Sequence, residues 1–278
     1  MALTHAACTH CGHWHLTFAG VDPPQCLVCS DVRNALPEDG FDFAGVERVA
    51  ALAGNAWSEA LPGVWGIRCE PAFGLGSTGW LIEHADGNVA FEAAPCYGED
   101  ALGFIAARGG LRAATCSHVH GMGALWMLQR RFAPEVPMHV DALPWTKALR
   151  VTWPFDDVHE LAPGLTLHHV GGHYEGHTVR HDAVRRALFA GDALKIDLHP
   201  DGRPRALSCH KAFHYRIPLS HGELRQYRRV FAGLAFEHVF TPFEHAAGVT
   251  REHALALFDL LLAGRPSVDP VPLEELLP

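Results

Sequence analysis

The chain has 278 residues, enough for one large domain or for one domain and a small module, and 48% of them are hydrophobic, as in globular proteins. Its 31 acidic side chains outnumber its 22 lysines and arginines, and the net charge of −9 argues against general binding to nucleic acid or to an anionic membrane. We therefore expect a globular protein that binds neither nucleic acid nor a membrane surface.

The N-terminus, Met-Ala-Leu-Thr-His, lacks the basic region and the long apolar stretch of a signal peptide. No later run approaches the ~18 uninterrupted apolar residues of a membrane span. We expect the protein to be cytoplasmic, in a reducing compartment where cysteines rarely form disulfides. Four cysteines scattered singly along the chain are then most simply buried thiols: Cys69, Cys96, Cys116 and Cys209.

The other four cysteines form two Cys-x-x-Cys pairs, Cys8 with Cys11 and Cys26 with Cys29. Two such pairs can close a tetrahedral site of four thiolates. Because residues 1–40 hold few apolar side chains, a structural zinc would supply the folding energy that so small a core lacks. The spacing therefore predicts a zinc-ribbon-like module over 1–40, with a disulfide pair or rubredoxin-type iron as alternatives. We expect its ion to bind independently of any larger site.

The charge of this module bears on its role. Arg33 is its only lysine or arginine, and the acidic side chains around it would repel phosphate. We interpret the module as a docking or structural element. The proline and glycine in 36–40 predict its end, so that a second domain covers 41–278.

From there the pattern alternates strands and helices. Glycine-punctuated apolar runs at 63–69, 76–83 and 88–93 predict an antiparallel meander, followed by a helix over 99–108. A strand over 111–116 then leads into His118 and His120, and a helix over 121–132 follows. Two histidines two residues apart at a strand end project to the same face, close enough to share a metal ion.

A second half repeats this alternation, which favours an α/β fold. Strands are expected over 136–140, 165–170 and 239–241, a hairpin over 179–182 and 187–190, and helices over 220–231 and 250–263. His173 and Asp192 each stand where an apolar run meets glycine. With His118 and His120 they make a plausible metal-binding set of three histidines and one carboxylate.

In this order, the paired histidines, the turn Gly-His-Tyr-Glu-Gly-His-Thr at 172–178 and the turn Phe-Ala-Gly-Asp at 189–192 resemble the metallo-β-lactamase superfamily. The resemblance implies an αβ/βα four-layer sandwich over 41–278, with His118, His120, His173 and Asp192 as metal ligands. The family's first motif usually reads His-x-His-x-Asp-His, and its last two residues bind a second metal. Met122 and Gly123 occupy those two positions here, so the resemblance implies a one-metal variant.

Further histidines lie near these motifs. His245 is the nearest candidate for the family's last ligand, and we predict Asp192 and His245 as the catalytic residues. His177 matches a histidine of the family turn that is usually not a ligand. His210 and His214 follow Asp192 closely and could line the pocket.

A divalent ion in such a site, zinc or iron, could lower the pKa of bound water toward ~7. This predicts a metal-dependent hydrolase whose partner is a small-molecule substrate with an ester, thioester, lactone or similar acyl bond. Two alternatives remain. His118, His173 and Asp192 alone would suit iron(II), as in persulfide dioxygenases of the same fold. The altered first motif and the added four-cysteine module would also suit a non-catalytic metal-binding protein.

Overall fold

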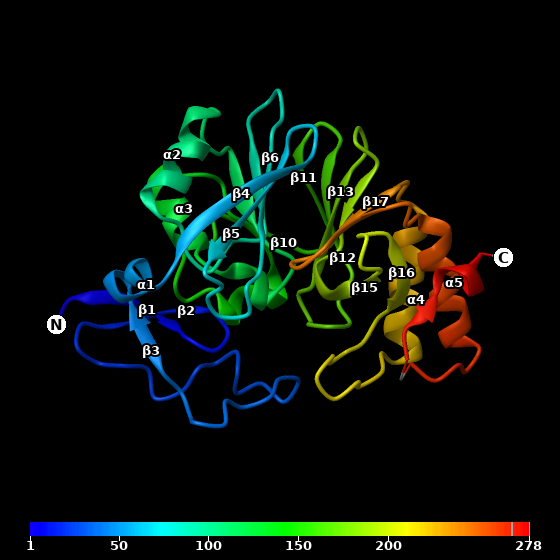
Figure 1. Cartoon of the computed structure of the whole chain (residues 1–278), viewed down its shortest axis with the longest axis horizontal. Helices are drawn as coiled ribbons and strands as arrows, with labels where there is room; N and C mark the ends of the chain where they lie inside the picture. Colours follow the sequence, from blue (N-terminus) through cyan, green and yellow to red (C-terminus); the bar gives the residue numbers. More distant parts are fainter. Residues whose placement is uncertain (268, 278) are drawn as a thin grey trace. The chain divides into compact units, whose positions relative to one another are not determined.

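The computed structural model describes residues 1–267 and 269–277, and the chain divides into two compact units, Met1–Phe155 and Asp156–Pro278. Each unit has its own central sheet (Figure 1). No helix in the described residues is long and apolar enough to cross a membrane.

The first unit begins with a small three-stranded sheet of order β2-β1-β3. Its central strand, β1 (Leu3–Cys8), pairs antiparallel with β2 (Trp14–Phe18) and with β3 (Phe43–Gly45), and α1 (Val46–Leu52) follows. The first Cys-x-x-Cys turn is therefore the β1–β2 connection. Because β3 lies beyond residue 40, the chain on both sides of the predicted domain boundary contributes to this sheet.

A five-stranded sheet follows, and its first four strands run antiparallel. The predicted meander is confirmed, with one further strand at its edge. The last strand joins parallel, through a crossover that contains the predicted helix α2 (Glu99–Ala107). The strands are β4 (Gly54–Leu61), β5 (Val64–Glu70), β6 (Gly79–Ile82), β7 (Val89–Phe91) and β8 (Ala113–Thr115).

The chain after β8 departs from the expected continuous helix over 121–132. A 3-10 turn, η1 (Val119–Met122), precedes α3 (Leu125–Phe132), and Gly123 separates them with a φ of 36°. That conformation favours glycine and cannot belong to a helix, which explains the break. The unit ends with β9 (Pro137–His139), the 3-10 segment η2 (Val140–Trp145) and β10 (Trp153–Phe155), which pairs parallel with β9.

The second unit is built on a six-stranded sheet of order β11-β12-β13-β14-β17-β18. The predicted hairpin is confirmed as β13 and β14. Only β14 and β17 pair parallel, and the connection between them contains α4 (His221–Ala232), which begins at a Ser220–Glu223 capping box. The strands are β11 (Val158–Ala162), β12 (Leu165–His169), β13 (Thr178–Asp182), β14 (Ala187–Phe189), β17 (His238–Phe240) and β18 (His245–Ala247).

The core of this unit lies between the sheet and two helices. Leu188 and Val239 from the sheet belong to one buried cluster with Tyr227 and Phe231 of α4 and with Phe258 of α5 (Arg251–Leu262). A smaller sheet and a final helical turn complete the unit. These elements are β15 (Lys195–Leu198), β16 (Pro204–Ser208), β19 (Val271–Pro272) and α6 (Leu273–Leu276).

Candidate metal centres

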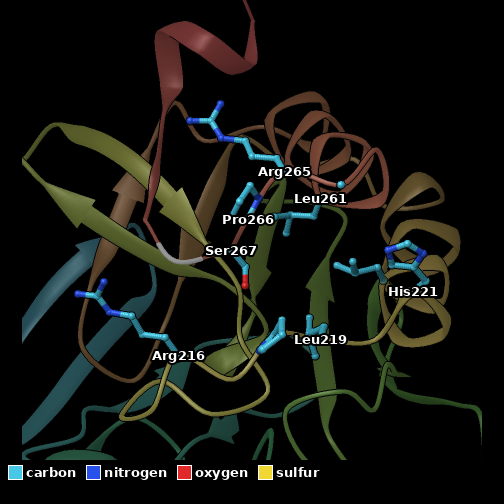
Figure 2. A pocket seen from close by; sticks show the side chains of 10 residues that line it. Arg216, Leu219, His221, Leu261, Arg265, Pro266 and Ser267 are labelled. Atoms are coloured by element: carbon cyan, nitrogen blue, oxygen red, sulfur yellow. The ribbon is translucent and has the colours of Figure 1, made fainter.

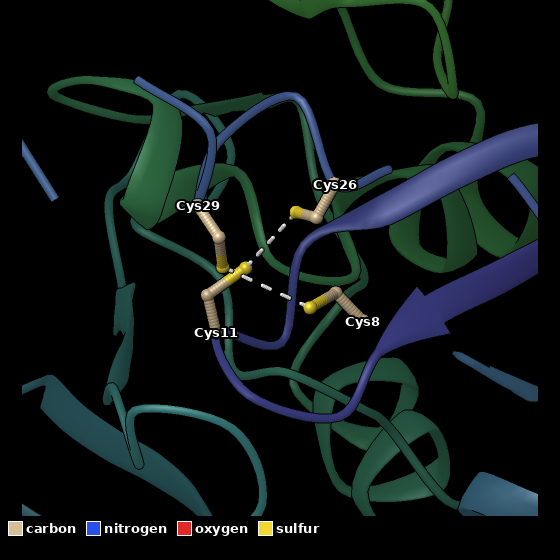
Figure 3. Close-up of side chains that lie close together, drawn as sticks. All are labelled: Cys8, Cys11, Cys26 and Cys29. Carbon is tan, nitrogen blue, oxygen red and sulfur yellow. Dashed lines mark hydrogen bonds between the residues drawn. The ribbon is translucent and has the colours of Figure 1, made fainter. Parts of the chain in front are cut away.

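The four N-terminal cysteines converge in the first unit (Figure 3). The sulfurs of Cys8 and Cys29 lie 3.8 Å apart and those of Cys11 and Cys26 lie 3.6 Å apart, and all four are within 4.8 Å of one another. A tetrahedral zinc with Zn–S bonds of about 2.3 Å separates its sulfurs by about 3.8 Å. A disulfide would need about 2.05 Å, and none of the cysteines forms one. The predicted four-cysteine cluster therefore has the geometry of a closed zinc site.

The protonation of these thiols is consistent with that assignment. Hydrogen bonds from Cys11, then from Cys29 and Cys8, lower the pKa of Cys26, whereas the contact with Cys26 raises the pKa of Cys11. Four buried sulfurs that share protons in this way exchange them for a divalent cation when one binds.

The predicted histidine pair lies directly after β8, also in the first unit. Ser117 Oγ is 2.8 Å from His118 Nδ1, and His118 Nε2 is 3.2 Å from His120 Nδ1. When Nδ1 of His118 donates to the serine hydroxyl, its Nε2 lone pair faces His120. Burial lowers the pKa of His118, followed by the effects of His120 and Arg33, so its imidazole is neutral and can bind a metal.

Glu92, which follows β7, holds this loop in place. Its backbone N–H donates to the Thr115 carbonyl over 3.0 Å, and its Oε2 accepts the Ser117 N–H over 3.2 Å. A Cβ on Gly121 would overlap that oxygen, so only glycine leaves room for the carboxylate. Glu92 was not predicted as part of the site, because residues 88–93 were expected to form one apolar strand. An acidic side chain inside an otherwise apolar run is the signal that could have revealed it.

The backbone after β7 supports the same loop from its other end. Ala93 N–H donates to the Gly121 carbonyl over 2.8 Å, and Ala124 N–H donates to the Ala94 carbonyl over 2.9 Å. A Cβ on Gly123 would clash with the Ala93 carbonyl oxygen. The left-handed φ and this close approach together exclude a larger residue at position 123 unless the loop moves.

The second unit brings together His173 and Asp192. His173 Nε2 lies 3.5 Å from Asp192 Oδ2, and its Nδ1 is 3.2 Å from the His210 carbonyl. A hydrogen bond from Nδ1 to that carbonyl leaves Nε2 as the metal-binding nitrogen. The His173 N–H donates to the Tyr227 hydroxyl, which in turn donates to the Gly171 carbonyl, so α4 fixes the turn.

The other histidines predicted near the site, His177, His214 and His245, differ in their surroundings. The buried His177 ring meets the His173 ring at a centroid distance of 5.8 Å, and His214 is exposed. His245 stacks on Phe240 at 4.2 Å, with its Nε2 3.4 Å from His238 Nδ1. Its catalytic role stays a prediction.

Glu244, the neighbour of His245, is a further acidic group near Asp192. Its Oε2 accepts a hydrogen bond from Thr241 Oγ1 over 2.5 Å. Burial raises the pKa of Glu244, and the negative charge of Asp192 raises it further. Glu244 was not predicted from the sequence, because its place near Asp192 depends on the turn between β17 and β18.

A cavity of about 380 Å³ in the second unit is lined by other residues (Figure 2). Leu219, Leu224 and Leu261 form its apolar part, and none of the predicted ligands lines it. The guanidinium groups of Arg216 and Arg265 point away from its centre and pair with Asp269 at 3.6 Å and Glu275 at 2.7 Å. This cavity is separate from the candidate metal ligands.

Known proteins resemble this chain in sequence and in fold. A family model described as "Metallo-beta-lactamase superfamily" matches residues 101–250. YmaE of Bacillus subtilis (strain 168), an uncharacterized protein, is 28% identical over 203 residues, which cover 68% of this chain and 72% of YmaE. The metallo-β-lactamase TMB-1 superposes with a TM-score of 0.56 at 12% identity, covering 75% of this chain and 98% of TMB-1.

Two further solved structures give the same result. FIM-1 from Pseudomonas aeruginosa, in its mono-zinc form, has a TM-score of 0.53 at 14% identity and covers 78% of this chain and 97% of its own. A metallo-β-lactamase from Hirschia baltica has a TM-score of 0.51 at 16% identity, covering 75% and 98%. At such low identities these structures establish the fold alone.

Proposed function

This chain belongs to the metallo-beta-lactamase superfamily, and from that premise we propose that it is a hydrolase of a small acyl substrate with one catalytic metal ion. The substrate class is an ester, thioester, lactone or similar bond. The observation that carries the proposal is the preset orientation of the ligand atoms. His118 Nε2 faces His120 Nδ1 and His173 Nε2 faces Asp192 Oδ2, while the other nitrogens of His118 and His173 have oxygen partners.

We propose that the two pairs share one ion. The separations within them, 3.2 Å and 3.5 Å, suit ligands of a single tetrahedral zinc, whose bonds of about 2.1 Å place its ligand atoms about 3.4 Å apart. Three neutral imidazoles and one carboxylate leave a position open for water or substrate when coordination expands to five. Superfamily membership supports this assignment, because the four residues occur in the order of the family motifs.

An ion held there would polarise the acyl carbonyl and lower the pKa of water toward ~7. The chain's own groups would do the rest. Asp192, whose side chain is 17% exposed, would orient the attacking water and accept its proton. The Ser117 hydroxyl and the His210 carbonyl would keep His118 and His173 in the tautomers that bind metal.

The sequence and conformation of the loop after β8 support one ion rather than two. A second ion would need ligands at Met122 and Gly123, where a thioether is a poor match for a hard cation and glycine offers no side chain. Any ligand side chain at position 123 would clash with the Ala93 carbonyl. Restoring the family's second site therefore requires a different loop conformation.

The iron dioxygenase alternative uses His118, His173 and Asp192 without His120. His120 Nδ1 lies 3.2 Å from His118 Nε2, which favours His120 as a fourth ligand and so favours the hydrolase. None of the eight cysteines forms a disulfide, as expected in a reducing compartment, and we propose the cytoplasm.

Metal analysis and activity assays on the same preparation test the function. We expect about two zinc ions per chain, one in each centre, and hydrolysis of at least one ester, thioester or lactone in a panel. The matched control is a variant of the exposed His214, His214→Ala, which should hydrolyse the same substrate at the wild-type rate. Iron in the histidine site with oxygen uptake on persulfide would replace the hydrolase with the dioxygenase, and three tightly held ions would restore two-metal chemistry.

A further inference from the structure

Two cysteines that are scattered in the sequence meet inside the first unit. The sulfurs of Cys69, on β5, and Cys96, in the segment between β7 and α2, lie 3.0 Å apart. The two residues are 4% and 3% exposed. The expectation that both are buried free thiols is confirmed, and the structure adds that the two sulfurs lie against each other.

The distance between the two sulfurs distinguishes this pair from the four-cysteine cluster of the same unit. The sulfurs of that cluster pair at 3.6 Å and 3.8 Å, the spacing of ligands around an ion, whereas Cys69 and Cys96 are closer. No third histidine, cysteine or carboxylate of the described residues joins them as a metal ligand set. A disulfide bond of about 2.05 Å needs the sulfurs to approach by only about 1 Å.

We propose that Cys69 and Cys96 are a redox modification site, which hydrogen peroxide converts to a disulfide. The sulfur of Cys96 attacks one peroxide oxygen, the O–O bond breaks, and Cys96 becomes a sulfenic acid as the first water leaves. The sulfur of Cys69 then displaces the hydroxyl group, which leaves as the second water with the thiol proton. The two sulfurs lose two electrons in total, and both peroxide oxygens are reduced to water.

The contacts of the pair favour this order of attack. The hydrogen bond with Cys69 lowers the pKa of Cys96, while the same contact and burial raise the pKa of Cys69. Cys96 is therefore the better first nucleophile, and Cys69 is already placed to resolve the sulfenic acid. The low exposure of both residues restricts the oxidant to one about the size of water.

The modification would fasten a segment that supports both centres of the unit. Pro95, next to Cys96, accepts a 2.7 Å hydrogen bond from Trp14 Nε1 of the four-cysteine module. Ala93 and Ala94, two and three residues earlier, hold the histidine loop through backbone hydrogen bonds. A bond from Cys96 to β5 would tie this supporting segment to the five-stranded sheet.

Limited oxidation of the zinc-loaded full chain tests the proposal. The protein is treated with hydrogen peroxide, bound zinc is measured, the remaining thiols are alkylated after unfolding, and peptides are mapped without reduction. We expect a peptide that links Cys69 to Cys96 at peroxide doses where Cys116 and Cys209 are still alkylated and the zinc of the four-cysteine cluster is retained. Dithiothreitol should restore both thiols.

The peptide map of the wild-type protein is enough to test the proposal, and two variants make the test more specific. Cys209→Ser, in the second unit, should form the linked peptide as the wild type does, whereas Cys69→Ser should leave Cys96 as a sulfenic acid that dimedone traps when the oxidised protein is unfolded in its presence. The proposal is overturned if the wild-type protein oxidises Cys116 or Cys209 at doses that leave Cys69 and Cys96 unlinked. Loss of zinc before the linked peptide forms would overturn it too.

Discussion

The four-cysteine cluster and the His118–His120 pair are both in the first unit, yet they are built in opposite ways. The cysteines come from two turns, and all four ligands of a closed site lie within 22 consecutive residues, 8–29. The histidine pair supplies two candidate ligands and depends for its shape on Glu92 and on the backbone after β7. A structural zinc site can be nearly local, whereas an open, reactive site needs support from distant residues.

The two centres are also in contact. Trp14, which follows the first cysteine turn, stacks edge-on against Trp126 of α3 at 5.2 Å and donates to Pro95. His13 is buried, and Val119 and His120 contribute to its electrostatic environment. The sequence predicts independent metal binding by the four-cysteine module. These contacts predict that loss of its ion disturbs the histidine loop as well.

The largest expected effect comes from Cys26→Ser. Losing one of four thiolates should abolish tight zinc binding by the module, where the ion contributes on the order of 10 kcal/mol to folding. We expect residues 1–40 to lose protection from hydrogen exchange. Because the module contacts the loop, we also expect metal affinity at the histidine pair to fall about 10-fold.

Cobalt substitution measures both centres in one sample, since thiolate ligands give intense charge-transfer bands that imidazole and carboxylate ligands lack. Cys209→Ser is the matched control and should keep both spectra. Unchanged cobalt affinity at the histidine site of Cys26→Ser would show that the centres are independent after all.

His118→Ala tests the same comparison by altering the histidine site while leaving the four-cysteine cluster unchanged. Removing a ligand from the open site costs several kcal/mol of transition-state stabilisation, so we expect hydrolysis to drop by about 10³-fold or more. The zinc of the four-cysteine cluster should remain, giving about one ion per chain by elemental analysis. Retention of two ions with full activity would contradict the assigned ligand set.

Glu92→Gln tests whether the open site needs its distant support. The substitution keeps the size of the side chain but removes the negative charge of the carboxylate that accepts the Ser117 N–H. We expect metal affinity at the histidine pair to fall about 10- to 100-fold, as for other groups that orient ligands. The exposed Glu99→Gln is the control, and equal affinities for both variants would remove Glu92 from the site.

The smallest expected effect comes from His13, the buried histidine whose environment includes Val119 and His120. Burial, then the neighbouring His15, lowers the pKa of His13 to about 3 from an ordinary value near 6.5. Between these values the unfolded chain binds the extra proton, so the stability that depends on neutral His13 is lost as pH falls below about 6.5. From pH 7 to pH 5.5 we expect the wild type to lose about 1.3 kcal/mol more stability than His13→Gln.

Urea unfolding in saturating zinc at the two pH values measures this difference. His10→Gln changes an exposed histidine in the same turn and should keep the wild-type pH dependence. A wild-type slope in His13→Gln would mean that another buried group is responsible.

Much of the architecture was predictable because its signals are local. The helices predicted over 220–231 and 250–263 are confirmed as α4 and α5, whose positions depend on apolar side chains at helical spacing within each segment. The hairpin of β13 and β14 followed from two apolar runs. In contrast β1, β3 and β4 were missed, since their sequences are short or partly exposed and their strand character comes from pairing with distant partners.

The sequence by itself determined the four-cysteine ligand set, the order of His118, His120, His173 and Asp192, and the loss of ligands at Met122 and Gly123. Those features depend on residue type and short spacing. Only the tertiary structure decided that Glu92 fits against Gly121, that Gly123 packs on the Ala93 carbonyl, and that Cys69 meets Cys96. The physical reason is that these contacts join strand ends and loops about 25 to 30 residues apart. At that separation, the local sequence pattern around one residue does not identify the residue that it contacts.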